Sequence, residues 1–199
     1  MRIRMLGLSL LLSCNPASPP ADAGQAAAAA TVDEASNAGS FPDDRLAVPS
    51  FEGWIACGGG PTAGKSTDLG AAYPDLLAPF VLNAGITGEP LPGLLERLPA
   101  LIARRPAGLI LEIGAEDASR QAPVRQFQAY LRQLEALLSR EPQLGLVIII
   151  STDAPAYQEP AEAAARRLGA TILKGASLLG PRAVEAHRHM ADALQPVVE

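Results

Sequence analysis

The sequence predicts an α/β fold: a doubly wound parallel sheet of five strands flanked by helices in a three-layer sandwich. Short apolar runs alternate along the chain with segments of helical periodicity, and this alternation is typical of parallel sheets. The run 145–151 is apolar on both faces, which indicates a strand inside such a sheet. Functional sites in these folds form at the carboxyl ends of the strands.

The expected strands are short apolar segments, and they cover Gly53–Cys57, Phe80–Asn83, Gly108–Ile113, Gly145–Ser151 and Thr171–Leu173. The clearest helix carries apolar residues at steps of three and four, namely Val124, Phe127, Leu131, Leu134 and Leu138. Further helices are expected over Leu94–Arg104, Ala161–Leu168 and Pro181–Leu194. Pro99 should kink or restart the first of these, because proline removes an interior hydrogen bond. Pro181 should open the last helix with its fixed φ.

The amino-terminal residues have the pattern of a targeting signal. Residues 1–5 are basic and residues 6–12 are a short apolar run. The stretch Leu11-Leu12-Ser13-Cys14 resembles a bacterial lipobox, which implies that residues 1–13 are removed and that Cys14 is acylated. An ordinary secretory signal is the alternative. The lipobox predicts a lipoprotein of the cell envelope that faces the periplasm or the exterior and has the membrane as a partner.

The rest of the chain divides into a linker and a domain. Residues 14–50 are rich in Pro, Ala, Ser and Asp and poor in large apolar residues, so we expect a disordered tether. Residues 51–199 are long enough for one globular domain. A net charge of −5 without basic clusters argues against a nucleic-acid partner, and two cysteines are too few for a disulfide framework. No cofactor is expected.

A glycine-rich loop follows the first expected strand, and it has two interpretations. The segment Gly59–Ser66 satisfies the P-loop pattern, with Gly59, Gly64, Lys65 and Ser66 as possible anion-binding residues. A P-loop opens a long helix at its lysine, whereas here Gly70 and Pro74 follow closely. The other interpretation rests on a set of motifs that runs through the whole domain.

That set of motifs resembles the SGNH/GDSL hydrolases, and most closely their periplasmic thioesterase/lysophospholipase/arylesterase members. The loop 57–67 with its continuation 71–77 is similar to the first block, and residues 81–88 to the second. Residues 109–117 are similar to the third block, which usually ends in G-G-N-D, and residues 174–177 stand where D-G-x-H is expected. The resemblance covers nearly all of residues 54–198 and implies the fold predicted above.

The resemblance also implies that the family's catalytic side chains are absent. In that family a serine attacks an ester carbonyl, a histidine accepts its proton, and an aspartate orients the histidine. The nucleophile position here is Gly60, the asparagine position is Glu116, the aspartate position is Lys174 and the histidine position is Ser177. Gly88, which supplies a backbone donor to the oxyanion hole, is retained. We therefore expect a vestigial pocket at Gly60, Gly88 and Glu116.

Other residues offer no obvious replacement for the lost catalytic groups. Hydroxyls near the loop, at Thr62, Ser66, Thr67 and Thr87, would each need a base. Both histidines lie in the last expected helix, where His187 should be packed and His189 should face water. Cys57 should be a small buried apolar residue.

Three acidic residues lie in or just after the third expected strand. Glu112, Glu116 and Asp117 have no accompanying histidine, so we expect them to be solvated or ion-paired, and no metal site is predicted. Glu116 and Lys174 are expected to face one cleft and to neutralise each other, unless both turn outward into water.

These observations favour a non-catalytic, lipid-anchored relative of the SGNH hydrolases that binds an acyl-type small ligand or an envelope protein. The first alternative is an ester or thioester hydrolase with a non-standard site. The second is a phosphate or nucleotide binder that uses Gly59–Ser66.

Overall fold

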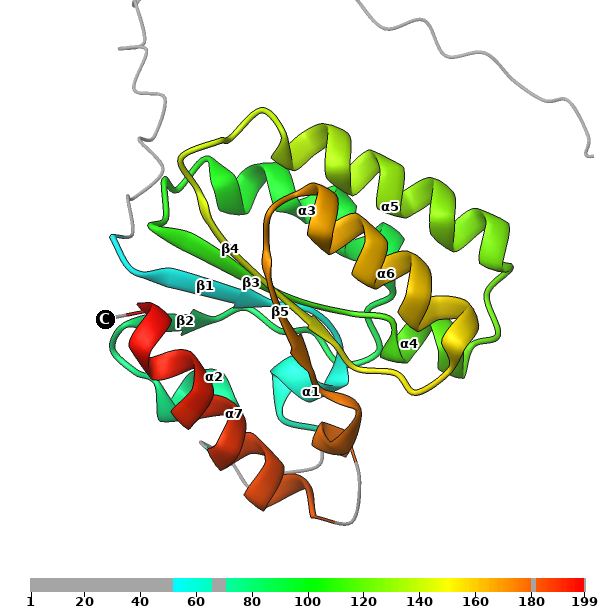
Figure 1. The fold of residues 1–199 in the computed structure, drawn as a ribbon. Coiled ribbons are helices and arrows are strands. Elements are labelled where there is room, and N and C mark those ends of the chain that lie inside the picture. The colour runs from blue at the N-terminus through cyan, green and yellow to red at the C-terminus, as the bar shows by residue number, and fades with distance from the viewer. Residues whose placement is uncertain (1–51, 66–70, 180–181, 199) are drawn as a thin grey trace, which may run out of the picture. The chain divides into compact units, whose positions relative to one another are not determined.

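The computed structural model describes residues 52–65, 71–179 and 182–198. The predicted signal, Cys14 and the linker lie outside these residues, and so do Ser66 and Thr67. The described residues form a three-layer α/β domain (Figure 1).

All five predicted strands are present, and they form one parallel sheet. The strands are β1 (Trp54–Cys57), β2 (Val81–Asn83), β3 (Gly108–Ile113), β4 (Gly145–Ile150) and β5 (Thr171–Lys174). Their order across the sheet is β2-β1-β3-β4-β5, and every neighbouring pair is parallel. The chain places β2 on one side of β1 and then β3, β4 and β5 on the other, which confirms the doubly wound fold.

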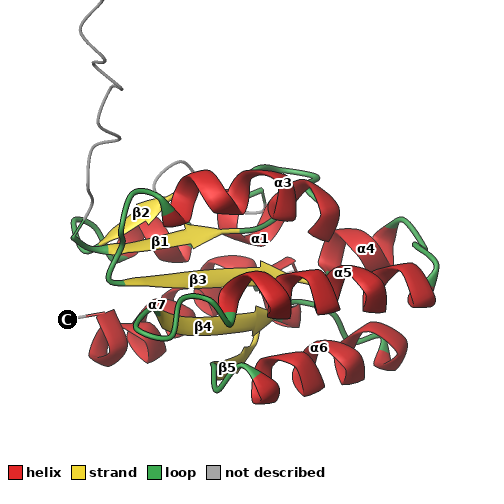
Figure 2. Cartoon of the chain, turned by 90° about the horizontal axis from the view of Figure 1, so that it is seen from above, coloured by secondary structure: helices red, strands yellow, loops and turns green. Residues whose placement is uncertain are grey.

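Helices cover both faces of this sheet (Figures 1 and 2). One face is covered by α3 (Leu91–Ile102), α5 (Val124–Leu138) and α6 (Pro155–Arg167). The other face is covered by α2 (Tyr73–Leu76) and α7 (Ala183–Val198). Three short elements follow strand ends: α1 (Gly60–Ala63), α4 (Ala115–Ser119) and a 3-10 turn over Ala176–Leu179. No helix among the described residues is long and apolar enough to cross a membrane.

The helix boundaries differ from the prediction, mainly at prolines. Helix α3 starts three residues earlier than predicted, with Pro92 in its first turn, and α6 starts at Pro155. Proline fits the first turn because no hydrogen-bonded N–H is needed there. Pro99 neither ends nor restarts α3, which continues through it to Ile102. The last helix, α7, runs on to Val198 with Pro196 inside it.

The amino-terminal ends of the central strands pack around one indole ring. Trp54 is 8% exposed, and its ring lies against the first residues of β3 and β4, Gly108 and Gly145. A Cβ at Gly108 would lie 2.4 Å from the ring, and one at Gly145 would lie 2.6 Å from it. Both strands therefore begin with glycine because the indole occupies the space that a side chain would need.

Candidate functional site

The glycine loop after β1 lies directly against the end of β3. Gly58 has a φ of +154°, and a Cβ there would lie 2.5 Å from the carbonyl oxygen of Glu112. The next residue, Gly59, donates its N–H to the Glu112 Oε2 atom at 2.7 Å. The loop then enters α1, and Gly64 ends that helix with a φ of 76°. Glycine at position 58 is thus required by close contact with β3.

This geometry differs from that of a P-loop. The helix in the loop is four residues long and lies before Lys65, whereas a P-loop helix begins at the lysine. The N–H of Gly59 is donated to a carboxylate of the chain itself, which would repel a phosphate at the same place. The described part of the loop therefore does not form the phosphate cradle that the sequence pattern offered as an alternative.

The structure places Gly60 beside Glu116, two of the three residues of the predicted vestigial pocket. A Cβ at Gly60 would lie 3.2 Å from Glu116 Oε1 and 3.1 Å from Lys65 Cδ, so both side chains lie over the position of the family nucleophile. The neighbouring Gly59 faces the carbonyl of Glu89, the residue after Gly88. Gly88 itself has a φ of +80°.

Hydrogen bonds and an ion pair secure the loop that carries Gly88. The guanidinium of Arg120 donates to the carbonyl of Gly88. Glu89 accepts two hydrogen bonds from Arg97, both at 2.6 Å. The Glu89 side chain is 7% exposed and the Arg97 side chain is 22% exposed. The carboxylate of Asp117 accepts the N–H of Leu91 at 3.1 Å, which fixes the start of α3. These contacts hold the segment after β2 against the segment after β3, at the carboxyl ends of the strands.

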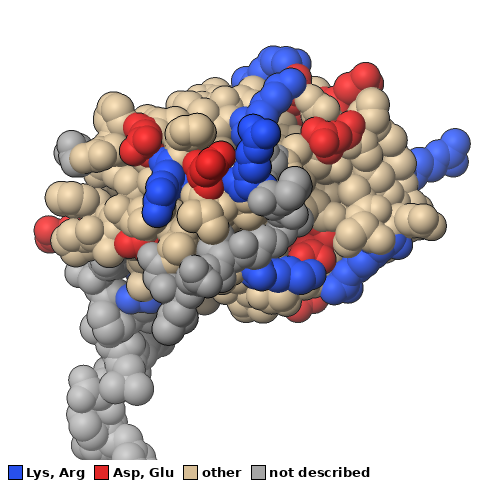
Figure 3. Space-filling view, turned by 90° about the horizontal axis from the view of Figure 1, so that it is seen from below, with Lys and Arg blue, Asp and Glu red and all other residues tan. Residues whose placement is uncertain are grey.

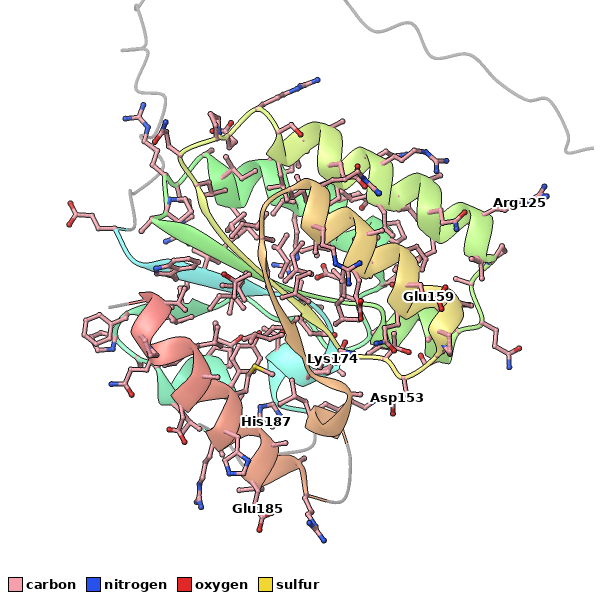
Figure 4. All side chains as sticks on the ribbon, in the orientation of Figure 1. Arg125, Asp153, Glu159, Lys174, Glu185 and His187 are labelled. Atoms are coloured by element: carbon pink, nitrogen blue, oxygen red, sulfur yellow. The ribbon has the colours of Figure 1, made fainter. Side chains whose placement is uncertain are left out.

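The predicted ion pair between Glu116 and Lys174 is wrong. Lys174 lies at the end of β5 (Figure 4). Its ammonium is 3.5 Å from the Glu162 carboxylate on α6, and its side chain is 71% exposed. Side chains alternate along a strand, and Ile172 packs in the cluster on the α6 side, so Lys174 follows it to that side. Ser177 lies in the 3-10 turn that follows β5.

A groove of about 370 Å³ lies between β5 and α7. Lys174, Arg182 and His189 line it, together with Glu185 and apolar residues of α7. None of its lining residues is Gly60, Gly88 or Glu116.

On the face seen from below in Figure 3, Lys and Arg side chains alternate with Asp and Glu and form no large field of one sign.

A buried polar network lies beneath the glycine loop, and its centre is Glu112. The side chain of Glu112 accepts from the hydroxyl of Ser151 and, at 3.5 Å, from that of Thr62. Thr62 Oγ1 also lies 3.0 Å from the hydroxyl of Tyr73. Glu112 is 3% exposed, and its burial raises its pKa to about 7.

The expectation that the acidic residues are solvated or ion-paired is wrong for Glu112 and Asp117. Both are 3% exposed and are held by uncharged donors. Among the described residues no group of three or more side chains could hold a metal ion. The signal for Glu112 was visible in the sequence, because a lone acid interrupts a strand that is otherwise apolar on both faces.

The histidine and cysteine predictions are confirmed. His187 is fully buried, its Nδ1 accepts the N–H of Tyr73 at 3.0 Å, and its ring stacks on Tyr73 at 6.0 Å between centroids. With Nδ1 occupied, the proton of the neutral ring is on Nε2, so neither nitrogen is free to act as a base. His189 is exposed. Cys57 is fully buried, which raises the pKa of its thiol to about 12.

Comparison with known proteins agrees with this architecture. The chain matches a family model, the GDSL-like lipase/acylhydrolase family, over residues 52–199. No curated protein matches significantly. A crystal structure of TesA is similar with a TM-score of 0.61 and 20% identity, over 73% of this chain and 97% of that one.

Two esterase structures are also similar. The psychrotrophic esterase EstA from Pseudoalteromonas sp. has a TM-score of 0.58 at 18% identity, over 73% of this chain and 96% of that one. AlinE4, an SGNH-hydrolase family esterase, has a TM-score of 0.55 at 17% identity, over 74% and 95%. At these identities the structures show the shared fold, and the family match covers the whole described domain. The chain therefore belongs to the GDSL-like lipase/acylhydrolase family, that is, to the SGNH/GDSL hydrolases.

Proposed function

We propose that this chain is a non-catalytic member of its family, held at a membrane through acylated Cys14, and that its domain binds an acyl-type ligand or an envelope protein. The observation that carries the proposal is the surroundings of Gly60. A glutamate and a lysine side chain lie where the family nucleophile and its transition state would be. A carboxylate beside a developing oxyanion would repel it.

The proton-transfer groups support the same conclusion. Among the described residues, no hydrogen bond joins a serine, threonine or cysteine side chain to a histidine. Thr62 is a buried hydroxyl in α1, and its partners are Tyr73 and Glu112. The Thr62–Glu112 contact is long, at 3.5 Å, and no histidine relays the proton as in the family's triad, whose members act together.

Hydrolysis of p-nitrophenyl butyrate and of a long-chain acyl-CoA tests the proposal. We expect the rate of the full chain to equal that of a heat-denatured sample. The variant Gly60→Ser should remain equally inactive, because a serine at position 60 would meet Glu116 and Lys65 in place of the family's histidine and the aspartate that orients it.

Turnover well above that background would contradict the proposal. Loss of such turnover in Thr62→Ala or Ser66→Ala, with the exposed Ser139→Ala as the matched control, would instead favour a hydrolase with a non-standard site. Thermal stabilisation by ATP that depends on Mg²⁺ would favour the nucleotide-binding alternative.

A further inference from the structure

Glu112 is a buried acid without a cationic partner. Its side chain is 3% exposed, and the ion pairs among the described residues do not include it. A buried carboxylate in this position needs donors, and it receives them from Gly59, Ser151 and Thr62. Each of these groups connects the carboxyl to a different segment: the glycine loop, the end of β4 and α1.

The Ser151 hydroxyl can serve both protonation states of the carboxyl. It has one proton and two acceptors in reach, Glu112 Oε1 and the carbonyl of Ile113, the latter at 3.1 Å. When Glu112 is ionised, Ser151 donates to it. When Glu112 takes a proton from water, the carboxyl donates to Ser151 Oγ, and the serine proton turns to Ile113.

The Thr62 hydroxyl can keep one arrangement in both states. Its Oγ1 lies 3.0 Å from the Tyr73 hydroxyl and 3.5 Å from Glu112 Oε2. Tyr73 can donate to Thr62 while Thr62 donates to Oε2, whether or not the other carboxyl oxygen carries a proton that it donates to Ser151. The network therefore satisfies its polar groups with or without the proton, which a buried acid with fixed donors would not allow.

Other titratable groups surround the carboxyl and set its response. They come from each element packed around it: Cys57 on β1, Lys65 after α1, Tyr73 on α2, Glu89 with Arg97 at α3, Glu116 on α4, and His187 on α7 through Tyr73. Burial raises the pKa values of Cys57 and Tyr73, which keeps both uncharged near neutrality. Glu116 is the like charge that opposes ionisation of Glu112.

We propose that Glu112 is a reversible proton switch beneath the glycine loop. The ionised carboxylate holds the N–H of Gly59 by a charge-assisted hydrogen bond, and the protonated carboxyl holds it by a weaker neutral one. The loop 58–60, which contains the position of the family nucleophile, is thus held firmly on the alkaline side of the transition and more loosely on the acid side. The pKa of about 7 for Glu112 places the transition near neutrality.

The amide resonance of Gly59 reports the switch directly. The ¹⁵N-labelled full chain is titrated from pH 5 to pH 9, and the Gly59 shift is expected to follow one sigmoid with a midpoint near pH 7. Hydrogen exchange of the Gly59 amide with solvent, corrected for the intrinsic exchange rate, should be slower above the midpoint than below it. The variant Glu112→Gln should remove the sigmoid, because glutamine offers the same acceptor without a proton to lose.

Two more variants move the midpoint in opposite directions and keep the test valid if Glu112→Gln does not fold. Ser151→Ala removes a donor to the ionised form, so the midpoint should rise by about one pH unit, tenfold in proton affinity. Glu116→Gln removes a like charge, so the midpoint should fall. Ser139→Ala, which removes an exposed hydroxyl at the end of α5, should leave the midpoint unchanged. A Gly59 shift that is flat between pH 5 and pH 9, or a midpoint that neither Ser151→Ala nor Glu116→Gln moves, would overturn the proposal.

Discussion

The wild-type chain should become less stable as the pH rises toward neutrality, because of Glu112. The variant Glu112→Gln should not show this pH-dependent loss. On folding, burial raises the pKa of this carboxyl from 4.5 to about 7. Between these two values the folded state keeps the proton and the unfolded state has lost it, so raising the pH favours unfolding. Integrated from pH 5 to pH 8, the loss in the free energy of unfolding is about 2.5 kcal/mol.

Urea unfolding followed by circular dichroism at four pH values measures this difference. Glutamine has the same shape, so its Oε1 can accept from Gly59 while its NH₂ donates to Ser151. The contributions of all other titrating groups cancel when the variant is subtracted from the wild type at each pH. The difference in the free energy of unfolding between wild type and variant should change by about 2.5 kcal/mol between pH 5 and pH 8. In thermal scans, the difference in Tm should change by roughly 5–10 °C over the same range. Parallel curves for the two proteins would refute the argument that Glu112 retains its proton on folding.

Three further outcomes are expected. Arg97→Met should lower the free energy of unfolding by about 3 kcal/mol because it leaves a buried carboxylate unpaired. The control Arg166→Met breaks an exposed ion pair on α6 and should lower the free energy of unfolding by about 0.5 kcal/mol or less in the same urea assay. Equal losses in the two variants would contradict the larger contribution expected of the Arg97–Glu89 pair. Gly145→Ala should destabilise the chain by about 1–3 kcal/mol, since the added methyl would lie 2.6 Å from the ring of Trp54; an unchanged unfolding midpoint would show that the ring can move aside. Cys14→Ala should release the protein from the membrane fraction of cells, and unchanged membrane association on immunoblots would remove the lipid anchor from the proposed function.

The strands and the family could be predicted from the sequence because they depend on local patterns. Apolar runs such as 145–150 determine which segments enter the sheet, and the alternation with helices determines that the strands are parallel. Helix ends were predicted less well, because a proline that stops one helix opens another, as Pro92 and Pro155 do. The absence of a nucleophile at Gly60 is likewise a property of the sequence alone.

The partners of the charged side chains were decided only by the tertiary structure. The ion pair of Lys174 depends on which face of β5 it occupies and on what α6 presents there, so Glu162 and not Glu116 became its partner. The pKa of Glu112 depends on donors from residues 39 and 53 positions away, which the sheet brings beneath the glycine loop. Local pattern reports which residues are apolar, whereas desolvation and hydrogen bonding depend on neighbours that only the complete fold supplies.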